Sequence, residues 1–181
     1  MVGSLDKISA SAPGNSKIRK ELLDITNRIH AAQNIKQILV DLKSEILKLF
    51  NANSLTIYVV DKLRNEIYSM FLAGTQLKEI RLPINNKSIA GYVANTGAVI
   101  NIENAYNAKE LKSIEAELTF DDSWDKKTGF KTRQVLAAPI YHNNQLMGAI
   151  QIINKKVGEG KFSEDEIGLA LEIAEVLGVA F

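Results

Sequence analysis

Residues 134–156, QVLAAPIYHNNQLMGAIQIINKK, form the stretch that decides the fold of this chain. Two apolar runs, 135–141 and 146–153, flank His-Asn-Asn-Gln, and asparagine tolerates the positive φ angles that a short hairpin turn requires. The pattern predicts a β-hairpin. Because both runs are apolar almost throughout, neither face of the hairpin suits water, so we expect it to lie centrally in a sheet that is covered on both faces.

Two residues inside this hairpin would disturb a regular ladder. Pro139 lacks a backbone donor and Gly148 lacks a side chain. Residues of this kind mark a strand end, a bulge or a close approach by another part of the molecule. We favour local geometry as the explanation of both.

Length and charge limit what the chain can be. Its 181 residues suit one domain with appended helices, because a domain of ~150 residues buries roughly two-thirds of its unfolded surface. With 22 Lys plus Arg against 21 Asp plus Glu, no global field attracts nucleic acid or an anionic membrane. No apolar run approaches ~18 residues and no signal pattern opens the chain, so we expect a soluble, cytoplasmic protein.

The residue types also argue against an enzyme. The chain has no cysteine, which excludes disulfides, thiolate nucleophiles, Cys-ligated zinc and iron–sulfur clusters. His30 and His142 are far apart in sequence, and neither has a nearby serine nucleophile or an HExxH neighbour. We therefore predict no catalytic residue and no metal site.

The N-terminal third reads as a leader followed by helices. Residues 1–15, rich in Ser, Ala and Gly, predict a disordered leader. Apolar residues spaced by three or four predict a helix from Ser16, its N-cap, to about Ala32, so that 16–33 forms an N-terminal linker or dimerisation helix. Asn34 can cap a second helix that ends near Asn51.

The rest of the chain alternates strands and short helices. We predict strands at 55–60 and 66–73 joined by a polar loop, strands at 78–82 and 98–102, helices at 89–95 and 108–118, and an irregular segment at 120–132. Ser88 caps the first of these helices and Gly97 closes it. A final helix capped by Ser163 runs to Phe181, and its apolar, uncapped end suggests a piece of a longer protein or pairing with another chain.

This order of elements predicts an α+β fold. We expect a central antiparallel sheet of about six strands, with the N- and C-terminal helices on one face. The short helices and a lid loop should cover the other face and enclose a pocket, where function would lie.

Several blocks resemble one known family. They are SIAGYVANTGAVINIENAY from Ser88, the run from Phe120 to Arg133, and the LAAPI and LMGAIQIINKK segments of the hairpin. Together they resemble the GAF domain, a sensor module of cyclic nucleotide phosphodiesterases, adenylyl cyclases, phytochromes and bacterial regulators. The resemblance covers roughly residues 35–181 and implies a GAF/PAS-like sheet, so 34–181 is predicted to be a GAF-like sensor domain that ends in the C-terminal helix.

The cyclic-nucleotide-binding members of this family hold their ligand between the sheet and the short helices. The residues that the resemblance assigns to ligand binding are Ser88, Ile89, Ala90, Gly91, Phe120, Asp125, Thr128, Thr132 and Gln151. Free N–H groups and the dipole at the helix start beside Ser88 can hold a phosphate. Asp125 can accept a hydrogen bond from a purine, and the threonine hydroxyls can donate or accept.

Each of these residues also has a local explanation. Ile89 and Ala90 suit the core face of a helix, and Ser88 suits an N-cap alone. Asp125 and Thr128 can shape a turn before Gly129. Gln151 needs partners because burying its amide unpaired would cost about 1–3 kcal/mol.

A second block matches the structural signature of the family. It consists of Asn154, Lys155, Phe162, Asp165 and Glu166. The resemblance implies a lysine–carboxylate bridge that ties the last strand to the last helix. The spacing from Phe162 to the acidic pair is one residue shorter than in the phosphodiesterases, so either carboxylate can meet Lys155.

The segment 107–119 is longer than the segment that family members usually have between the Asn-Ala-Tyr block and the Phe block. It lies in the lid, so this segment could close over a ligand, favour another metabolite, or fill the site itself.

We therefore predict a regulatory, non-enzymatic sensor domain cut from a larger signalling protein whose output domain lies outside this chain. No cofactor is required, and cyclic AMP and cyclic GMP are the candidate ligands. Closure of residues 102–132 over the ligand would act through the sheet on the terminal helices, which could pair in a homodimer. The rival is a ligand-free scaffold that dimerises or docks onto an adjoining catalytic or ATPase domain.

Overall fold

The predicted hairpin lies within the sheet of the computed structural model, which describes residues 13–73 and 76–181. Its strands are β5 (Val135–His142) and β6 (Gln145–Lys155), joined by a turn in which Asn143 and Asn144 have φ of 48° and 60°. These are the positive angles expected of the asparagine pair. The prediction of a central hairpin is confirmed.

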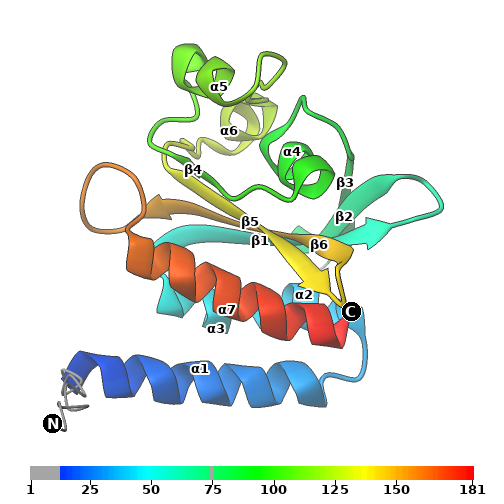
Figure 1. The fold of residues 1–181 in the computed structure, drawn as a ribbon, viewed down its shortest axis with the longest axis vertical. Helices are drawn as coiled ribbons and strands as arrows, with labels where there is room; N and C mark the ends of the chain where they lie inside the picture. The colour runs from blue at the N-terminus through cyan, green and yellow to red at the C-terminus, as the bar shows by residue number, and fades with distance from the viewer. Residues whose placement is uncertain (1–12, 74–75) are drawn as a thin grey trace, which may run out of the picture.

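Four more strands complete an antiparallel sheet (Figure 1). They are β1 (Ala52–Asp61), β2 (Glu66–Ala73), β3 (Gln76–Pro83) and β4 (Ile100–Ile102). The order across the sheet is β3-β2-β1-β6-β5-β4, so β6 pairs with both β1 and β5. The α+β class and the predicted strand number are confirmed.

Pro139 and Gly148 lie next to an irregularity in this ladder. The register shifts between Ile140 and Tyr141, and Gly148 lies opposite both Ile140 and Val59. A Cβ on Gly148 would come within 1.9 Å of the carbonyl oxygen of Tyr58. Glycine is therefore required at this position by the close approach of β1.

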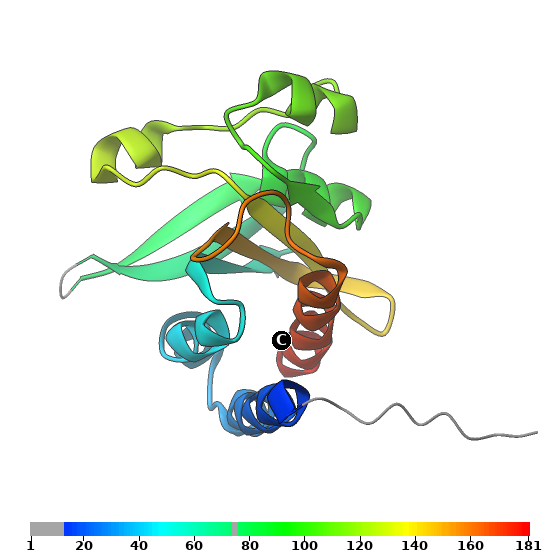
Figure 2. The same ribbon diagram turned by 90° about the vertical axis from the view of Figure 1, so that its left-hand side faces the viewer.

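Helices cover one face of the sheet in two layers (Figures 1 and 2). Next to the sheet lie α2 (Ile35–Val40), α3 (Lys43–Leu49) and α7 (Glu164–Ala180), and beneath them lies α1 (Pro13–Ala31), which contacts α7 and α3. Ser163 caps α7 in a capping box with Glu166, as its sequence indicates. Ile150 and Ile152 of β6 are fully buried on this face.

Two of the helices on this face differ from the sequence-based expectation. Helix α1 begins at Pro13, so Ser16 lies inside the helix and is not its N-cap; residues 1–12 of the predicted leader lie outside the described residues. The helix expected over 35–51 is divided into α2 and α3 because the N–H groups of Asp41 and Leu42 both bond to the carbonyl of Gln37.

The short helices lie on the opposite face (Figure 1). They are α4 (Ile89–Thr96), α5 (Ala108–Ile114) and α6 (Ser123–Thr128). Ser88 caps α4 and Gly97 ends it in the left-handed conformation, as predicted. The helix expected over 108–118 ends at Ile114, and α6 lies inside the segment expected to be irregular.

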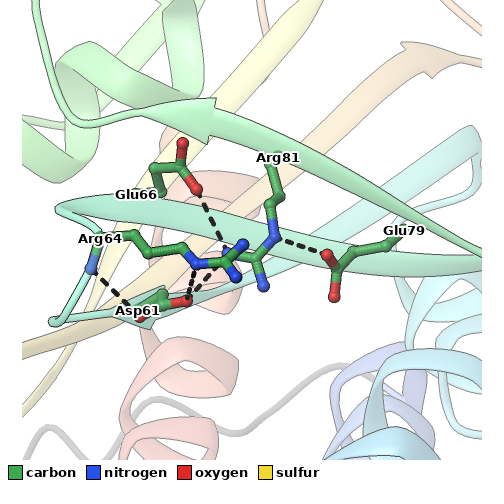
Figure 3. A network of polar contacts seen from close by, with 5 residues as sticks. All are labelled: Asp61, Arg64, Glu66, Glu79 and Arg81. Atoms are coloured by element: carbon green, nitrogen blue, oxygen red, sulfur yellow. Dashed lines mark hydrogen bonds and ion pairs between the residues drawn. The ribbon is translucent and has the colours of Figure 1, made fainter.

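A network of charges joins the edge strand β3 to the β1–β2 turn (Figure 3). The guanidinium of Arg81 bonds to Asp61 at 2.9 Å and to Glu66 at 3.3 Å, and it also pairs with Glu79. The hydrogen bond from Arg81 holds the pKa of Asp61 below its ordinary value. Charged side chains of this kind protect an edge strand from pairing with another sheet.

Among the described residues, no helix has the combination of length and apolar character needed to cross a bilayer.

Two glycines of α7 predict opposite effects of the same substitution. A Cβ at Gly178 would lie 2.1 Å from the carbonyl oxygen of Tyr141, whereas a Cβ at Gly168 would meet nothing within 4 Å. We expect Gly178→Ala to lower the free energy of unfolding by about 1–3 kcal/mol because α7 must move away from β5. Gly168→Ala should raise it by about 0.5–1 kcal/mol because alanine favours the helix. Urea denaturation of both variants measures the difference, and equal effects would show that α7 does not pack on β5 at this distance.

Candidate functional site

The layer between the sheet and the short helices is filled by aliphatic side chains. Leu111 of α5 and Leu118 are 3% and 1% exposed, and they pack with Ile89 and Val93 of α4. The sheet contributes Ile100, Ile102, Val135, Ala137, Ala149 and Ile153 to the same cluster. The long 107–119 segment therefore occupies the predicted concavity with its own leucines.

The start of α4 lies beneath the same segment. The Ser88 hydroxyl accepts the N–H of Gly91 at 3.1 Å, and the carbonyl of Lys87 accepts both the N–H and the hydroxyl of Thr119 at 2.9 and 3.0 Å. Ile89, Ala90 and Gly91 are buried. These bonds hold the chain after Leu118 against the loop that enters α4.

Asp125 is the polar centre of the lid, which we define as residues 102–132. It is 5% exposed, and its carboxylate accepts the backbone N–H of Thr132 at 2.6 Å and the Thr132 hydroxyl at 2.9 Å. It also accepts the hydroxyl of Tyr106 at 2.8 Å, and this bond raises the pKa of Tyr106 to about 12. Asp125 therefore joins α6, the loop after β4 and the approach to β5.

The other predicted ligand residues are placed differently. Thr128 is exposed; its hydroxyl donates to the carbonyl of Trp124 at 2.8 Å and accepts the N–H of Phe130 at 3.3 Å, which shapes the end of α6. Phe120 is half-buried and packs edge-on against Tyr106, with ring centroids 5.2 Å apart. Gln151 is partly exposed and lies opposite Ala137 in the ladder, on the sheet face that the short helices cover. The structure thus brings Asp125, Thr132 and Phe120 together around Tyr106 and leaves Thr128 outside.

The signature residues hold loops together. Lys155 pairs with Glu166 at 3.6 Å, while Asp165 is exposed, so Glu166 is the partner that the sequence left open. Asn154 has a φ of 56°; its side chain accepts the N–H of Arg133 and donates to the carbonyl of Lys131, both at 2.7 Å. The end of the lid is therefore fastened to the end of β6.

Sequence reasoning missed two residues that position the lid. In the sequence, Tyr106 is marked only by its place in the Asn-Ala-Tyr block, and its bond to Asp125 joins positions 19 residues apart. Glu110 belongs to an acidic region that the sequence predicts to be solvated surface, but its carboxylate accepts the N–H groups of Glu103 at 2.9 Å and Asn104 at 3.1 Å and pairs with Lys161 at 3.3 Å. Burial alone would raise the pKa of Glu110, but these partners outweigh it and hold the pKa below its ordinary value.

Two hollows meet at Tyr106. The inner hollow, of about 200 Å³, is lined by Ala105, Tyr106, Ala108, Leu111, Lys112, Leu118, Thr119, Phe120 and Asp122. The outer hollow, of about 630 Å³, is lined by Asn104, Tyr106, Asp122, Lys126, Lys131 and Arg133. Within residues 13–73 and 76–181, no group of three or more histidine and acidic side chains is arranged to hold a metal ion.

The amino-acid sequence of this chain is similar to a family model and to two known proteins. A family model described as the GAF domain matches residues 34–181. The chain is 32% identical over 155 residues to the probable 3',5'-cyclic phosphodiesterase pde-5 of Caenorhabditis elegans, across 78% of this chain and 20% of that protein. It is 36% identical over 89 residues to the dual 3',5'-cyclic-AMP and -GMP phosphodiesterase 11A of Takifugu rubripes, across 49% of this chain and 9% of that protein. The chain thus spans a small part of both relatives.

Solved structures share the fold. The GAF domain of a phosphoenolpyruvate-protein phosphotransferase from Coxiella burnetii matches with a TM-score of 0.71 at 20% identity, across 91% of this chain and 92% of that one. The free methionine-R-sulfoxide reductase of Neisseria meningitidis, solved with its substrate, matches with a TM-score of 0.68 at 14% identity, across 95% of this chain and 92% of that one. At these identities the similarity shows the fold alone.

The buried bonds of Asp125 predict the cost of removing its charge. Asp125→Asn turns an acceptor into a donor beside Thr132 and Tyr106, so we expect a loss of about 1–3 kcal/mol in the free energy of unfolding. The pKa of Tyr106 should fall from about 12 towards its ordinary value. Urea denaturation and NMR titration of labelled tyrosine measure the two effects. Asp24→Asn, on an exposed carboxylate of α1, is the control and should change little; equal stability of both variants would contradict this role of Asp125.

The depressed pKa of Glu110 predicts a pH-dependent attachment of the lid. The ionised carboxylate is the form that its three partners stabilise, so its contribution is present above the ordinary glutamate pKa and is lost as pH falls through the lower folded value. At pH 7 we expect Glu110→Gln to reduce stability by about 1–3 kcal/mol and to accelerate hydrogen exchange at Glu103 and Asn104. The difference should shrink in acid. Glu117→Gln, on an exposed carboxylate of the same segment, should not have these effects; a pH-independent difference would rule out the ionised carboxylate as the cause.

Proposed function

The chain belongs to the GAF family, and from that premise we propose that it is a regulatory sensor domain that binds a small ligand, with cyclic AMP and cyclic GMP as the leading candidates. Two relatives of this chain are cyclic phosphodiesterases, and the chain spans 20% and 9% of their lengths. This supports a regulatory module linked to an output domain elsewhere in a longer protein. We propose that the module is cytoplasmic and has no catalysis of its own.

The observation that carries the proposal is the position of Asp125. Its buried carboxylate accepts three hydrogen bonds, all from lid residues, at the edge of the aliphatic layer. A carboxylate has about four acceptor positions, so one remains. Asp125 lines neither hollow, so a purine N–H or amino group would reach this position only after the lid moves. Gln151 on the sheet and the Ser88 end of α4 would supply the other polar contacts.

Ligand binding requires the lid to move. The inner hollow holds about 200 Å³, below the roughly 300–1,000 Å³ of typical ligand sites, and neither Ser88, Asp125 nor Gln151 lines it. Leu111 and Leu118 occupy the remaining space, so a nucleotide must displace them. A ligand that takes the place of Leu118 against Ile89 can make its contacts only when the lid is displaced. It therefore binds the displaced state of the lid more tightly than the closed state and raises the population of the displaced state.

The shift would reach the terminal helices through the sheet. The lid is fastened to β6 by Asn154, and β5 contacts α7 at Gly178. Exposed apolar side chains remain on these helices, with Leu23 of α1 59% exposed and Val179 of α7 57% exposed. We propose that the terminal helices pair with those of a second copy, so that the lid position influences the dimer.

One observation favours a second candidate function. Leu118 is 1% exposed and packs as core, which is the arrangement expected of a scaffold whose site is filled by its own chain. Such a domain would dimerise or dock onto an adjoining domain without any ligand.

Calorimetry and thermal unfolding with cyclic AMP and cyclic GMP distinguish the two candidates. A ligand at 100 times its dissociation constant should add about 2.7 kcal/mol of stability, and hydrogen exchange in residues 102–132 should change on binding. No response to either nucleotide would count against the cyclic-nucleotide sensor and support the scaffold.

A matched pair of variants tests the site itself. Gln151→Ala removes the amide on the covered sheet face, and we expect binding to weaken about tenfold because a polar contact is lost. Gln145→Ala makes the same change on the same strand, at an exposed position beside the hairpin turn, and should bind as the parent does. Equal affinities of the two variants would remove Gln151 from the site.

A further inference from the structure

The outer hollow has a charge unlike that of the whole molecule. Its lining includes the cations Lys126, Lys131 and Arg133 and one carboxylate, Asp122, a net charge of +2, whereas the complete chain carries +1. Its volume of about 630 Å³ falls within the range of small-molecule sites. Three separate parts of the chain build it: the loop after β4, α6 and the segment before β5.

The backbone beneath two of these cations is held rigidly. The Thr132 side chain is buried and bonds to Asp125, whereas its neighbours Lys131 and Arg133 are both exposed. Asn154 bonds to the backbone of both neighbours at 2.7 Å, and the carbonyl of Arg133 accepts the N–H of Ala105 at 2.8 Å. The two positive side chains therefore start from fixed positions.

The charges of these two residues are not neutralised. Among the described residues, neither Lys131 nor Arg133 has a carboxylate within ion-pair distance. The Lys131 ammonium lies 5.9 Å from the centre of the Tyr106 ring, where a cation interacts favourably with the aromatic face. Lys126, which also lines the hollow, pairs with Asp122 at 2.9 Å. Like charges gathered around one hollow repel each other, and an anion between them removes that repulsion.

We propose that the outer hollow is a second ligand site, which binds the phosphate group of a small phosphorylated molecule. Arg133 supplies a planar pair of donors that matches two phosphate oxygens, and Lys131 and Lys126 supply point charges. Tyr106 offers an aromatic wall for the remainder of the ligand. An extended polyanion such as nucleic acid is disfavoured because the chain as a whole is almost neutral.

This site is separate from the interior site proposed above but is connected to it. Tyr106 lines both hollows and donates to Asp125, so an occupant of the outer hollow contacts a residue that holds the lid. The interior site uses Ser88, Gln151 and the sheet, none of which lines the outer hollow.

Pyrophosphate is a suitable probe, since it is compact and carries no base that could enter the interior. The single tryptophan, Trp124, lies on α6 between Asp122 and Lys126 and reports on this region. We expect saturable binding at one site, seen by tryptophan fluorescence and calorimetry, that weakens as salt increases. Amide NMR signals of residues 104–106, 122–126 and 131–133 should shift, and those of residues 88–91 should not.

The double variant Lys131→Gln/Arg133→Gln should bind pyrophosphate at least about tenfold more weakly, because both unpaired charges are gone. The control, Lys36→Gln/Lys62→Gln, removes the same charge from two exposed positions on α2 and the β1–β2 turn. It should bind as the parent does. Equal losses in the two double variants, binding that does not saturate, shifts at residues 88–91, or no response at all would each overturn the proposal. Failure of cyclic nucleotides to bind the interior would not affect it.

Discussion

The whole structure depends on covering both faces of one hairpin. Strands β5 and β6 are apolar on both sides, and leaving either side in water would expose side chains worth roughly 1.5–3 kcal/mol each on burial. Ile150 and Ile152 point to the terminal helices, whereas Ala149 and Ile153 point to the short helices. The chain must therefore supply two separate layers, and it uses its two ends for one and its middle for the other (Figure 2).

The two layers are built by different means. Helices α2, α3 and α7 bury aliphatic side chains against the sheet, and Asn34 and Ser163 cap the starts of α2 and α7. The lid has less regular structure. Glu110 and Asp125 bond to backbone groups inside it, at residues 103, 104 and 132, and Asn154 of β6 attaches its end at residues 131 and 133. Such attachments are polar and few, so the lid can be released at a smaller cost than a core helix.

The filled layer explains why the two candidate functions share one structure. Leu111 and Leu118 complete the core in the absence of a ligand and would be its competitors in the presence of one. A ligand must make better contacts than the leucines that it displaces. Asp125 and Gln151 are polar groups with which leucine cannot form hydrogen bonds. Tyr106 connects this interior to the cationic hollow outside, so the lid could respond on both of its sides.

The sequence by itself determined those features that a few adjacent residues encode. The hairpin with its Asn-Asn turn, the Ser88 and Ser163 caps and the Gly97 helix end all follow from local backbone preferences and periodicity, and all are present. Only the tertiary structure decided which partners distant side chains meet. Tyr106 reaches Asp125 across 19 residues, Asn154 reaches Lys131 across 23, and Leu118 turns into the core after α5 ends early. Contacts of this kind depend on how whole elements pack, and no pattern of neighbouring residues records that geometry.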